Sequence, residues 1–362
     1  MTTYALVTGG GTGGHVYPAL ALADELVARG HPRDAIRFVG SARGLEVTVV
    51  PAAGYRIDVL PGRGFDRARS LRAVARNLRT AWDTIVAFTR ALSIVQRTRP
   101  SVVVGVGGYA SLPTVVAARL HRIPTVVHEA DAHPGLANRI AARLGARPAV
   151  SWPGTPLPHA VVTGNPIRPH VARVQRSPVT PPVVAVVGGS LGARRINRAT
   201  LALADLWRDR DDVVVHHVTG ARDYEECRTQ SAALGFPGRP LDYRLVRYED
   251  HMDALYSDAT VMVCRSGGMT AELAAVGMPS LLVPLPGAPG DHQTRNAEVF
   301  HDAGAAVVVA DDQLDGPRLQ RELEPLLADP PRLDAMSRAA RALARLDATA
   351  RFADLVEEMA GG

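Results

Sequence analysis

Short apolar runs that end in glycine-rich turns, each followed by a helical repeat, are the dominant pattern of this chain. The first run, Ala5-Leu6-Val7, predicts a buried strand. Apolar residues then recur at helical spacing from Val16 to Val27, and Gly30 predicts the end of that helix. Between the two lies the segment 9–15, where bare backbone at a helix N-terminus lets a bound anion approach N–H donors.

The same pattern recurs three times, after the Val-rich runs 102–104, 183–187 and 261–263. Each run predicts a strand, and a helical repeat follows each glycine cluster. Four such junctions predict an α/β protein with two open parallel sheets, whose loops bind ligands at the carboxyl ends of the strands. The three later clusters are Gly105-Val106-Gly107-Gly108-Tyr109, Gly188-Gly189-Ser190-Leu191-Gly192 and Ser266-Gly267-Gly268-Met269-Thr270.

The chain has 362 residues, a length typical of two domains. A cluster of prolines near its middle divides it. We expect a first domain over residues 1–163 and a proline-rich linker over 164–182, where proline blocks helix. A second alternation of strand and helix predicts a domain over 183–340. The helical pattern at 341–362 closes the chain, and we expect it to pack back on the first domain.

Composition excludes several classes of protein. All 41 residues counted as Lys or Arg are Arg, so no lysine is present for a phosphate loop, a Schiff base or a general base. The two cysteines, Cys227 and Cys264, lack the spacing of a zinc site. A strand begins within a few residues of Met1, and no apolar stretch reaches the roughly 18 residues of a membrane helix. We therefore expect a cytoplasmic protein without a signal peptide.

The chain has a net charge of +5, and its basic residues are concentrated between Arg63 and Arg99. Four arginines fall on one helical face, beside an apolar stripe that contains Trp82, Ile85 and Phe88. Such a helix either buries its stripe in the core or rests on an anionic membrane surface. The sequence contains no nucleic-acid recognition motif beside this charge. The predicted membrane-contact residues are Arg69, Arg72, Arg76, Arg79 and Trp82.

The motifs together resemble those of the MurG family, in family order over nearly the whole chain. The first is Gly-Gly-Gly-Thr-Gly-Gly-His at 9–15. The others are found at 105–113, 128–129, 164–168, 188–190, 264–267, and 291–293 with 296–297. The resemblance implies the GT-B architecture, in which two Rossmann-like doubly wound domains face each other across a cleft. It also implies inverting transfer of N-acetylglucosamine from UDP-N-acetylglucosamine to the 4-hydroxyl of lipid-linked muramyl-pentapeptide, in peptidoglycan synthesis.

Within this resemblance, His15 is the candidate base for the acceptor hydroxyl. A helix N-terminus disfavours the imidazolium and keeps the ring able to accept a proton. Glu129 and Asp131 are rival acid–base groups. Arg168 would contact the departing diphosphate, and the carboxylate of Glu272 would bind both ribose hydroxyls. The predicted donor-binding residues are Thr12, Gly13, Gly14, Asp131, Arg168, Gly189, Ser190, Glu249, Gly268, Met269, Thr270, Glu272, His292 and Gln293.

We expect no cofactor and no metal. Asp209-Arg210-Asp211 has the Asp-x-Asp form of metal-dependent transferases, but it precedes the predicted strand 213–218 and therefore lies at the wrong end of the sheet. His216 and His217 are adjacent in that strand and point to opposite faces. We interpret all of these residues as structural.

The chain departs from the family pattern at three places, which leaves a second acceptor open. Asp131 stands where most members carry Asn, the stretch 265–272 is one residue short, and Glu249 occupies a usually aliphatic position. A related enzyme that glycosylates another lipid-phosphate or natural-product acceptor is therefore an alternative.

Two other classes of enzyme fit part of the pattern. Residues 188–192 match G-x-S-x-G, the nucleophile elbow of serine hydrolases, with Ser190 as the nucleophile. A nicotinamide oxidoreductase would need an acidic residue about 20 positions after the first glycines, and the strand at 37–40 offers none at its end.

Overall fold

The structure, a computed structural model, describes residues 3–11, 13–42, 44–61, 71–189 and 192–361, with only the backbone of 71–82 and 289. Its contacts divide the chain into two compact units, Met1–Arg168 with Arg345–Gly362, and Pro169–Ala344. The division at Arg168 falls inside the segment 164–182 that we expected as a linker. The closing segment from Arg345 belongs to the first unit.

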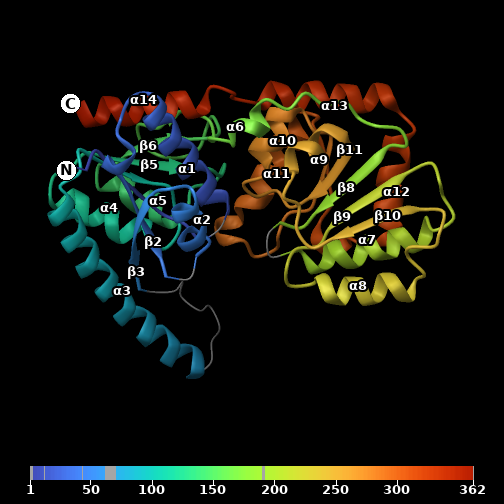
Figure 1. Cartoon of the computed structure of the whole chain (residues 1–362), viewed down its shortest axis with the longest axis horizontal. Coiled ribbons are helices and arrows are strands. Elements are labelled where there is room, and N and C mark those ends of the chain that lie inside the picture. Colours follow the sequence, from blue (N-terminus) through green and yellow to red (C-terminus); the bar gives the residue numbers. More distant parts are fainter. Residues whose placement is uncertain (1–2, 12, 43, 62–70, 190–191, 362) are drawn as a thin grey trace. The chain divides into compact units, whose positions relative to one another are not determined.

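The first unit contains a seven-stranded parallel sheet in the order β3-β2-β1-β4-β5-β6-β7. Strands β2, β3, β5 and β6 of this sheet are labelled in Figure 1. Its strands are β1 Ala5–Thr8, β2 Ile36–Ser41, β3 Arg56–Leu60, β4 Val102–Gly105, β5 Thr125–Glu129, β6 Arg147–Val150 and β7 Val161–Val162. Its helices are α1 Gly13–Ala28, α2 Glu46–Ala52, α3 Leu71–Thr98, α4 Ser111–Leu120, α5 Leu136–Arg143 and α14 Ala348–Gly361.

Alternation along the strands places core residues on both faces of this sheet. Val7 and Val104 pack with α1 and with Phe352 of α14 on one face. Leu6 and Val103 pack with α3 and α4 on the other face. Strands buried on both sides read as continuous apolar runs, which explains why the sequence pattern predicted them.

The second unit contains a six-stranded parallel sheet in the order β10-β9-β8-β11-β12-β13. Its strands are β8 Val183–Val187, β9 Val214–Val218, β10 Asp242–Val246, β11 Ala259–Cys264, β12 Ser280–Leu282 and β13 Ala306–Val308. Its helices are α6 Pro169–Ala172, α7 Arg194–Leu206, α8 Tyr224–Ala233, α9 Met252–Asp258, α10 Thr270–Val276, α11 His292–Asp302, α12 Gly316–Leu327 and α13 Pro330–Leu343.

Two doubly wound parallel sheets confirm the predicted fold class. Each of the four glycine clusters lies between a strand and a helix, at the carboxyl end of β1, β4, β8 or β11. The strand orders reverse direction beside β1 and β8, and ligands of open α/β sheets bind at such switch points.

Helix α3 is the helix that was expected to be amphipathic, but it buries a different set of apolar residues. The predicted stripe included Ile85 and Phe88, but Ile85 is 56% exposed. The buried residues are instead Ala87, Ala91, Ile94 and Val95. Phe88 of the predicted stripe is partly buried. The predicted membrane-contact residues Arg69, Arg72, Arg76, Arg79 and Trp82 lie outside the residues and side chains that the structure describes.

None of the helices in the described part of the chain is both long enough and apolar enough to cross a membrane.

Candidate functional site

The glycine loop after β1 is anchored to the strands on both sides of it. The Gly9 N–H donates to Val39 O at 3.1 Å, and the Gly10 N–H donates to Gly107 O at 3.2 Å. At Gly108, which has a φ of +83°, a Cβ would lie 2.2 Å from the Gly10 carbonyl oxygen. The backbones of the two glycine loops of the first unit are therefore in close contact at the carboxyl edge of the sheet.

His15, the candidate base, lies in the first turn of α1 and is partly buried. Its Nδ1 is 3.2 Å from the Gly10 carbonyl oxygen. A carbonyl oxygen only accepts hydrogen bonds, so Nδ1 carries the ring hydrogen and Nε2 has the lone pair. A Cβ at Gly107 would lie 2.9 Å from Nε2, so the glycine makes room for the ring. This tautomer is the one that a base acting through Nε2 requires.

Glu129, one rival acid–base group, ends β5 and is 5% exposed. Its carboxylate accepts the N–H groups of Asp131 at 3.0 Å and Gly135 at 2.9 Å, and the side-chain amide of Asn138 at 2.9 Å. Burial and the charge of Asp131 raise the pKa of Glu129, and these hydrogen bonds act against that increase. Three donors on one buried carboxylate favour a positioning role, because they hold the loop that leads into α5.

His128 precedes Glu129 in β5 and interacts electrostatically with His15. The ring is buried, lies 4.9 Å from the Phe352 ring, and its Nε2 is 3.1 Å from the Gly164 carbonyl oxygen. Burial lowers the pKa of His128 to about 4; His15 also lowers it, and Asp131 raises it. His15 and Asp131 therefore both act electrostatically on His128.

Arg168 lies near the start of α1. Its guanidinium carbon is 5.2 Å from the centroid of the Tyr17 ring. The same ring would be 3.1 Å from a Cβ at Gly13. Arg168 and Gly13 thus both lie next to the Tyr17 ring, and Gly14 follows Gly13 in the first turn of the helix.

In the second unit, hydrogen bonds tie the loop after β11 to α11. The Ser266 hydroxyl donates to Gln293 O at 2.7 Å, and the buried Asn296 amide donates to Ser266 O at 3.0 Å. The Thr270 hydroxyl donates to Gly267 O at 2.9 Å. The predicted donor-binding residues Gly268, Met269, Thr270, His292 and Gln293 therefore lie in one connected set of loops and helix starts.

The carboxylates of Glu272 and Glu249 both accept hydrogen bonds from other residues of the protein. The Tyr256 hydroxyl donates to Glu272 Oε2 at 2.8 Å, in the first turn of α10. Glu249 Oε1 accepts the His251 N–H at 2.9 Å, and its Oε2 lies 3.1 Å from His216 Nε2. The Glu249 side chain therefore faces the neighbouring strand β9.

The loop after β8 has little freedom at Gly192. This residue has a φ of +84°, and a Cβ there would lie 2.2 Å from the Thr219 carbonyl oxygen. Gly189 has a φ of +82° with open space around it. The predicted site residues Thr12 and Ser190 lie outside the described residues.

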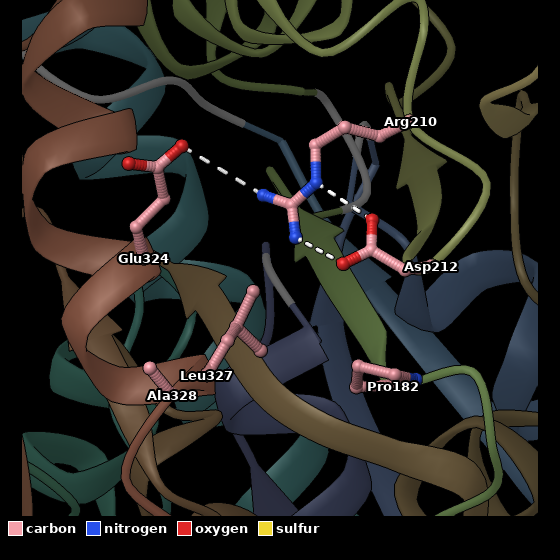
Figure 2. A pocket seen from close by; sticks show the side chains of 6 residues that line it. All are labelled: Pro182, Arg210, Asp212, Glu324, Leu327 and Ala328. Atoms are coloured by element: carbon pink, nitrogen blue, oxygen red, sulfur yellow. Dashed lines mark hydrogen bonds and ion pairs between the residues drawn. The ribbon is translucent and has the colours of Figure 1, made fainter.

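The Asp-x-Asp segment lies beside a pocket at the amino ends of β8 and β9 (Figure 2). Arg210 binds Asp212 through two hydrogen bonds of 2.8 Å and lies 3.7 Å from Glu324 Oε1. This pocket is therefore at the sheet edge opposite the glycine loops. Within the described ranges, His, Cys, Asp and Glu side chains form no group of three that could hold a metal ion.

Two residues near these loops were missed from the sequence. Arg265 donates to Val283 O at 3.0 Å and Pro284 O at 3.1 Å, and it pairs with Asp311 at 2.7 Å, so it ties the ends of β11, β12 and β13 together. Glu46 is 2% exposed and accepts the Gly11 N–H at 2.7 Å. The strand residues 37–40 carry no acid, and the carboxylate that meets the first glycine loop comes instead from α2.

The sequence contains a feature from which Arg265 and Glu46 could have been predicted. Each follows a predicted strand that neighbours a glycine-loop strand, and parallel strands place their carboxyl ends at one edge.

Comparison with known proteins places these features in a family. Residues 5–149 match the glycosyltransferase family 28 N-terminal domain, and residues 183–359 match the glycosyltransferase family 28 C-terminal domain. Two relatives are named UDP-N-acetylglucosamine–N-acetylmuramyl-(pentapeptide) pyrophosphoryl-undecaprenol N-acetylglucosamine transferase. The protein of Alkalilimnicola ehrlichii is 40% identical (99% of this chain, 100% of the relative), and that of Desulforudis audaxviator is 37% identical (98% of each).

A solved structure agrees with the sequence relatives. The crystal structure of Acinetobacter baumannii MurG matches with a TM-score of 0.77 at 26% identity, over 98% of this chain and 99% of that one. Both halves and the full length of the chain are thus covered by one family. The chain belongs to glycosyltransferase family 28 and, within it, to the MurG family of GT-B transferases.

Proposed function

We propose that this protein transfers N-acetylglucosamine, with inversion, from UDP-N-acetylglucosamine to the 4-hydroxyl of lipid-linked muramyl-pentapeptide, converting lipid I to lipid II in peptidoglycan synthesis. The observation that carries the proposal is the 37–40% identity to transferases of that name over essentially the full length of both chains. The site chemistry supports it, because a base and a set of anion-binding loops are the groups that this reaction needs.

In the proposed reaction, the acceptor oxygen attacks the anomeric carbon while the bond from that carbon to the diphosphate breaks. His15 Nε2 takes the acceptor proton, which the tautomer set by Gly10 permits. Backbone N–H groups at the glycine loops and the Arg168 guanidinium stabilise the negative charge that develops on the departing UDP. Glu129 holds the adjacent loop, and Asp131 lies close enough to His128 to affect its charge.

The donor is bound mainly by the second unit in this proposal. Glu272 accepts the ribose hydroxyls, and the backbone at Glu249 contacts the uracil edge. Met269, Thr270, His292 and Gln293 surround the diphosphate and sugar, with Gly189 and Gly268 giving close backbone approach. We also propose that the reaction uses no metal, because Arg168 offers the cationic charge and the Asp-x-Asp segment lies at the amino ends of the strands.

We propose further that the first unit binds the inner membrane surface from the cytoplasmic side, where its acceptor is anchored. The predicted basic residues at 69–79 supply charge that attracts anionic lipids. Two exposed apolar side chains, Ile85 at 56% and Leu136 at 69%, lie in helices α3 and α5 of the same unit. Vesicle sedimentation tests this: changing Arg69, Arg72, Arg76 and Arg79 to Gln should release the protein from anionic vesicles, and unchanged binding would contradict the role.

A second acceptor is favoured by one observation, the carboxylate of Asp131 in place of the family amide. It adds negative charge beside Glu129 and raises the pKa of that carboxyl. A related enzyme acting on another lipid-phosphate or natural-product acceptor would share the donor and differ here.

The deciding experiment offers UDP-N-acetylglucosamine with a short-chain lipid-linked muramyl-pentapeptide and detects the disaccharide product by mass. The proposal predicts product with this donor and little with other UDP-sugars. If the protein binds UDP but forms no disaccharide, the result would indicate a transferase that acts on a different acceptor. Failure to bind UDP in calorimetry would contradict the donor as well.

A further inference from the structure

A buried carboxylate lies under the loop that carries the proposed base. Glu46, the first residue of α2, is 2% exposed and accepts three hydrogen bonds. Its Oε2 accepts the Gly11 N–H at 2.7 Å. Its Oε1 accepts the N–H of Ser41 at 2.8 Å and the hydroxyl of the same residue at 2.9 Å. One side chain thus joins the loops that follow β1 and β2.

Three glycines enclose this carboxylate. A Cβ at Gly10, Gly40 or Gly44 would lie 2.2, 2.5 or 1.9 Å from the nearest Glu46 atom. Side chains at any of these positions would displace the carboxylate. The absence of a side chain at these three positions therefore makes the space that the Glu46 carboxylate occupies.

Glu46 and His15 hold the two sides of one peptide group. The N–H that Glu46 binds belongs to Gly11, and the carbonyl that His15 Nδ1 binds belongs to Gly10, so both are part of the peptide bond between these residues. In a trans peptide these two groups point in opposite directions from a rigid plane. Fixing the N–H on one side therefore fixes the carbonyl on the other.

A peptide between two glycines needs such an anchor. Gly10 and Gly11 have φ values of +143° and +95°, a region in which glycine moves with little steric resistance. If this plane turned over, an N–H would face His15 Nδ1 in place of the carbonyl. The ring would then carry its hydrogen on Nε2, and that nitrogen would lose the lone pair that accepts a proton.

We propose that Glu46 is a positioning residue that sets the tautomer of His15 through the Gly10–Gly11 peptide. Its carboxylate holds the N–H side of the plane, polarises the group, and so strengthens the carbonyl as acceptor for Nδ1–H. The catalytic meaning of this arrangement rests on the proposed function, in which His15 Nε2 is the base. The effect on the tautomer does not depend on turnover.

The test compares the full-length protein with Glu46→Met and Glu46→Ala, neither of which offers an oxygen to the Gly11 N–H, by ¹⁵N NMR of the histidine rings at a pH where they are neutral. His15 signals are assigned with His15→Gln. We expect wild-type His15 to be protonated at Nδ1, and both Glu46 variants to shift toward protonation at Nε2. The kcat for transfer should fall about 10- to 100-fold, within what a general base contributes, with little change in donor KM.

Ser41→Ala is the matched control. It removes a hydroxyl that donates to Oε1 and leaves the bond from Glu46 to Gly11 in place, so the His15 tautomer should stay as in the wild type. If Glu46→Ala fails to fold, Glu46→Met decides the question, because it keeps a side chain of similar length without an oxygen acceptor.

An unchanged His15 tautomer in the folded Glu46 variants would overturn the inference, as would an equal shift in Ser41→Ala. If the wild type shows no transfer while the tautomer responds to Glu46, the proposed function fails and the inference about the ring stands. A normal kcat with a shifted tautomer would instead refute the link between Glu46 and catalysis.

Discussion

At the scale of single residues, His15 and His128 show how bonding and burial separate two neighbouring imidazoles. His128 is 1% exposed and donates through Nε2 to the Gly164 carbonyl oxygen. His15 is partly exposed and has its hydrogen on Nδ1, toward Gly10. His128 therefore uses its Nε2 to hold the Gly164 backbone, whereas the hydrogen of His15 lies on the opposite ring nitrogen, Nδ1.

Removing the His15 ring should affect chemistry more than binding. In the proposed reaction His15→Ala lowers kcat by about 100-fold or more, the contribution of a general base, and leaves the donor KM within a few-fold of wild type. Steady-state kinetics with varied UDP-N-acetylglucosamine measures both quantities. The matched control is His301→Ala, an exposed position at the end of α11. A normal kcat in His15→Ala would remove the ring from the base role.

Buried His217 should make the protein less stable in acid. Its ring is 0% exposed, with Nδ1 2.7 Å from the Tyr243 hydroxyl and Nε2 3.1 Å from the Asn197 side-chain oxygen. Burial, helped by His216, lowers its pKa to about 3. Above the unfolded pKa of about 6.5, both states hold the ring neutral. As pH falls below this value, only the unfolded state gains the proton, so stability decreases, by roughly 3 kcal/mol at pH 4.

Urea unfolding measured between pH 4 and 7 checks this effect. The free energy of unfolding should rise with pH up to about 6.5 and then level off, with His128 adding to the same trend in the first unit. His217→Gln should have a shallower slope, and exposed His301→Gln the wild-type slope. Equal slopes in all three proteins would show that His217 titrates as it does in the unfolded chain.

At the scale of elements, the glycine junctions were predictable because each combines a buried strand, a turn and an amphipathic helix in sequence order. Periodicity located β1, β4, β8 and β11, and the structure confirms each as a strand. What periodicity did not predict is which loops touch. Glu46 and Arg265 act on residues of other loops, and only the order of the strands brings these together.

Gly192 provides a test at this scale, because both its φ and its surroundings require glycine. Gly192→Ala would place a Cβ 2.2 Å from the Thr219 carbonyl oxygen at a φ of +84°. We expect a loss of about 2 kcal/mol or more in unfolding free energy, together with weaker UDP binding, since α7 begins next to this loop.

Gly304→Ala is the control for backbone strain alone. It has a φ of +75° with open space around it, so it should cost only about 1 kcal/mol. Thermal unfolding and UDP calorimetry compare the two variants. Equal losses would mean that the contact with Thr219 relaxes without cost.

At the scale of the whole molecule, the end of the chain completes the first unit. Helix α14 buries Phe352, Leu355 and Val356 in the core that contains Val7 and Val104. Arg29 of the first unit also pairs with Asp354 at 2.6 Å and Glu357 at 2.7 Å. More than 150 residues of the second unit separate α14 in sequence from the core that it completes.

Phe352→Ala should therefore destabilise the first unit and leave the second unit intact. Truncating a fully buried phenylalanine costs about 3–5 kcal/mol. Calorimetry should show one unfolding transition shifted to lower temperature, with the transition that UDP stabilises unchanged. Leu346→Ala is the control, since that side chain is 59% exposed. A shift of both transitions together would mean that the units unfold as one.

The sequence by itself determined the two parallel sheets, the glycine junctions and most of the candidate site, because these depend on local periodicity and on residues close together in the chain. Tertiary structure alone decided the bonding of each site residue. It placed Glu46 beneath the Gly10–Gly11 peptide and enclosed Glu129 among three donors. These contacts join segments that the fold brings together at strand ends or in the core, and helix or strand periodicity carries no information about them.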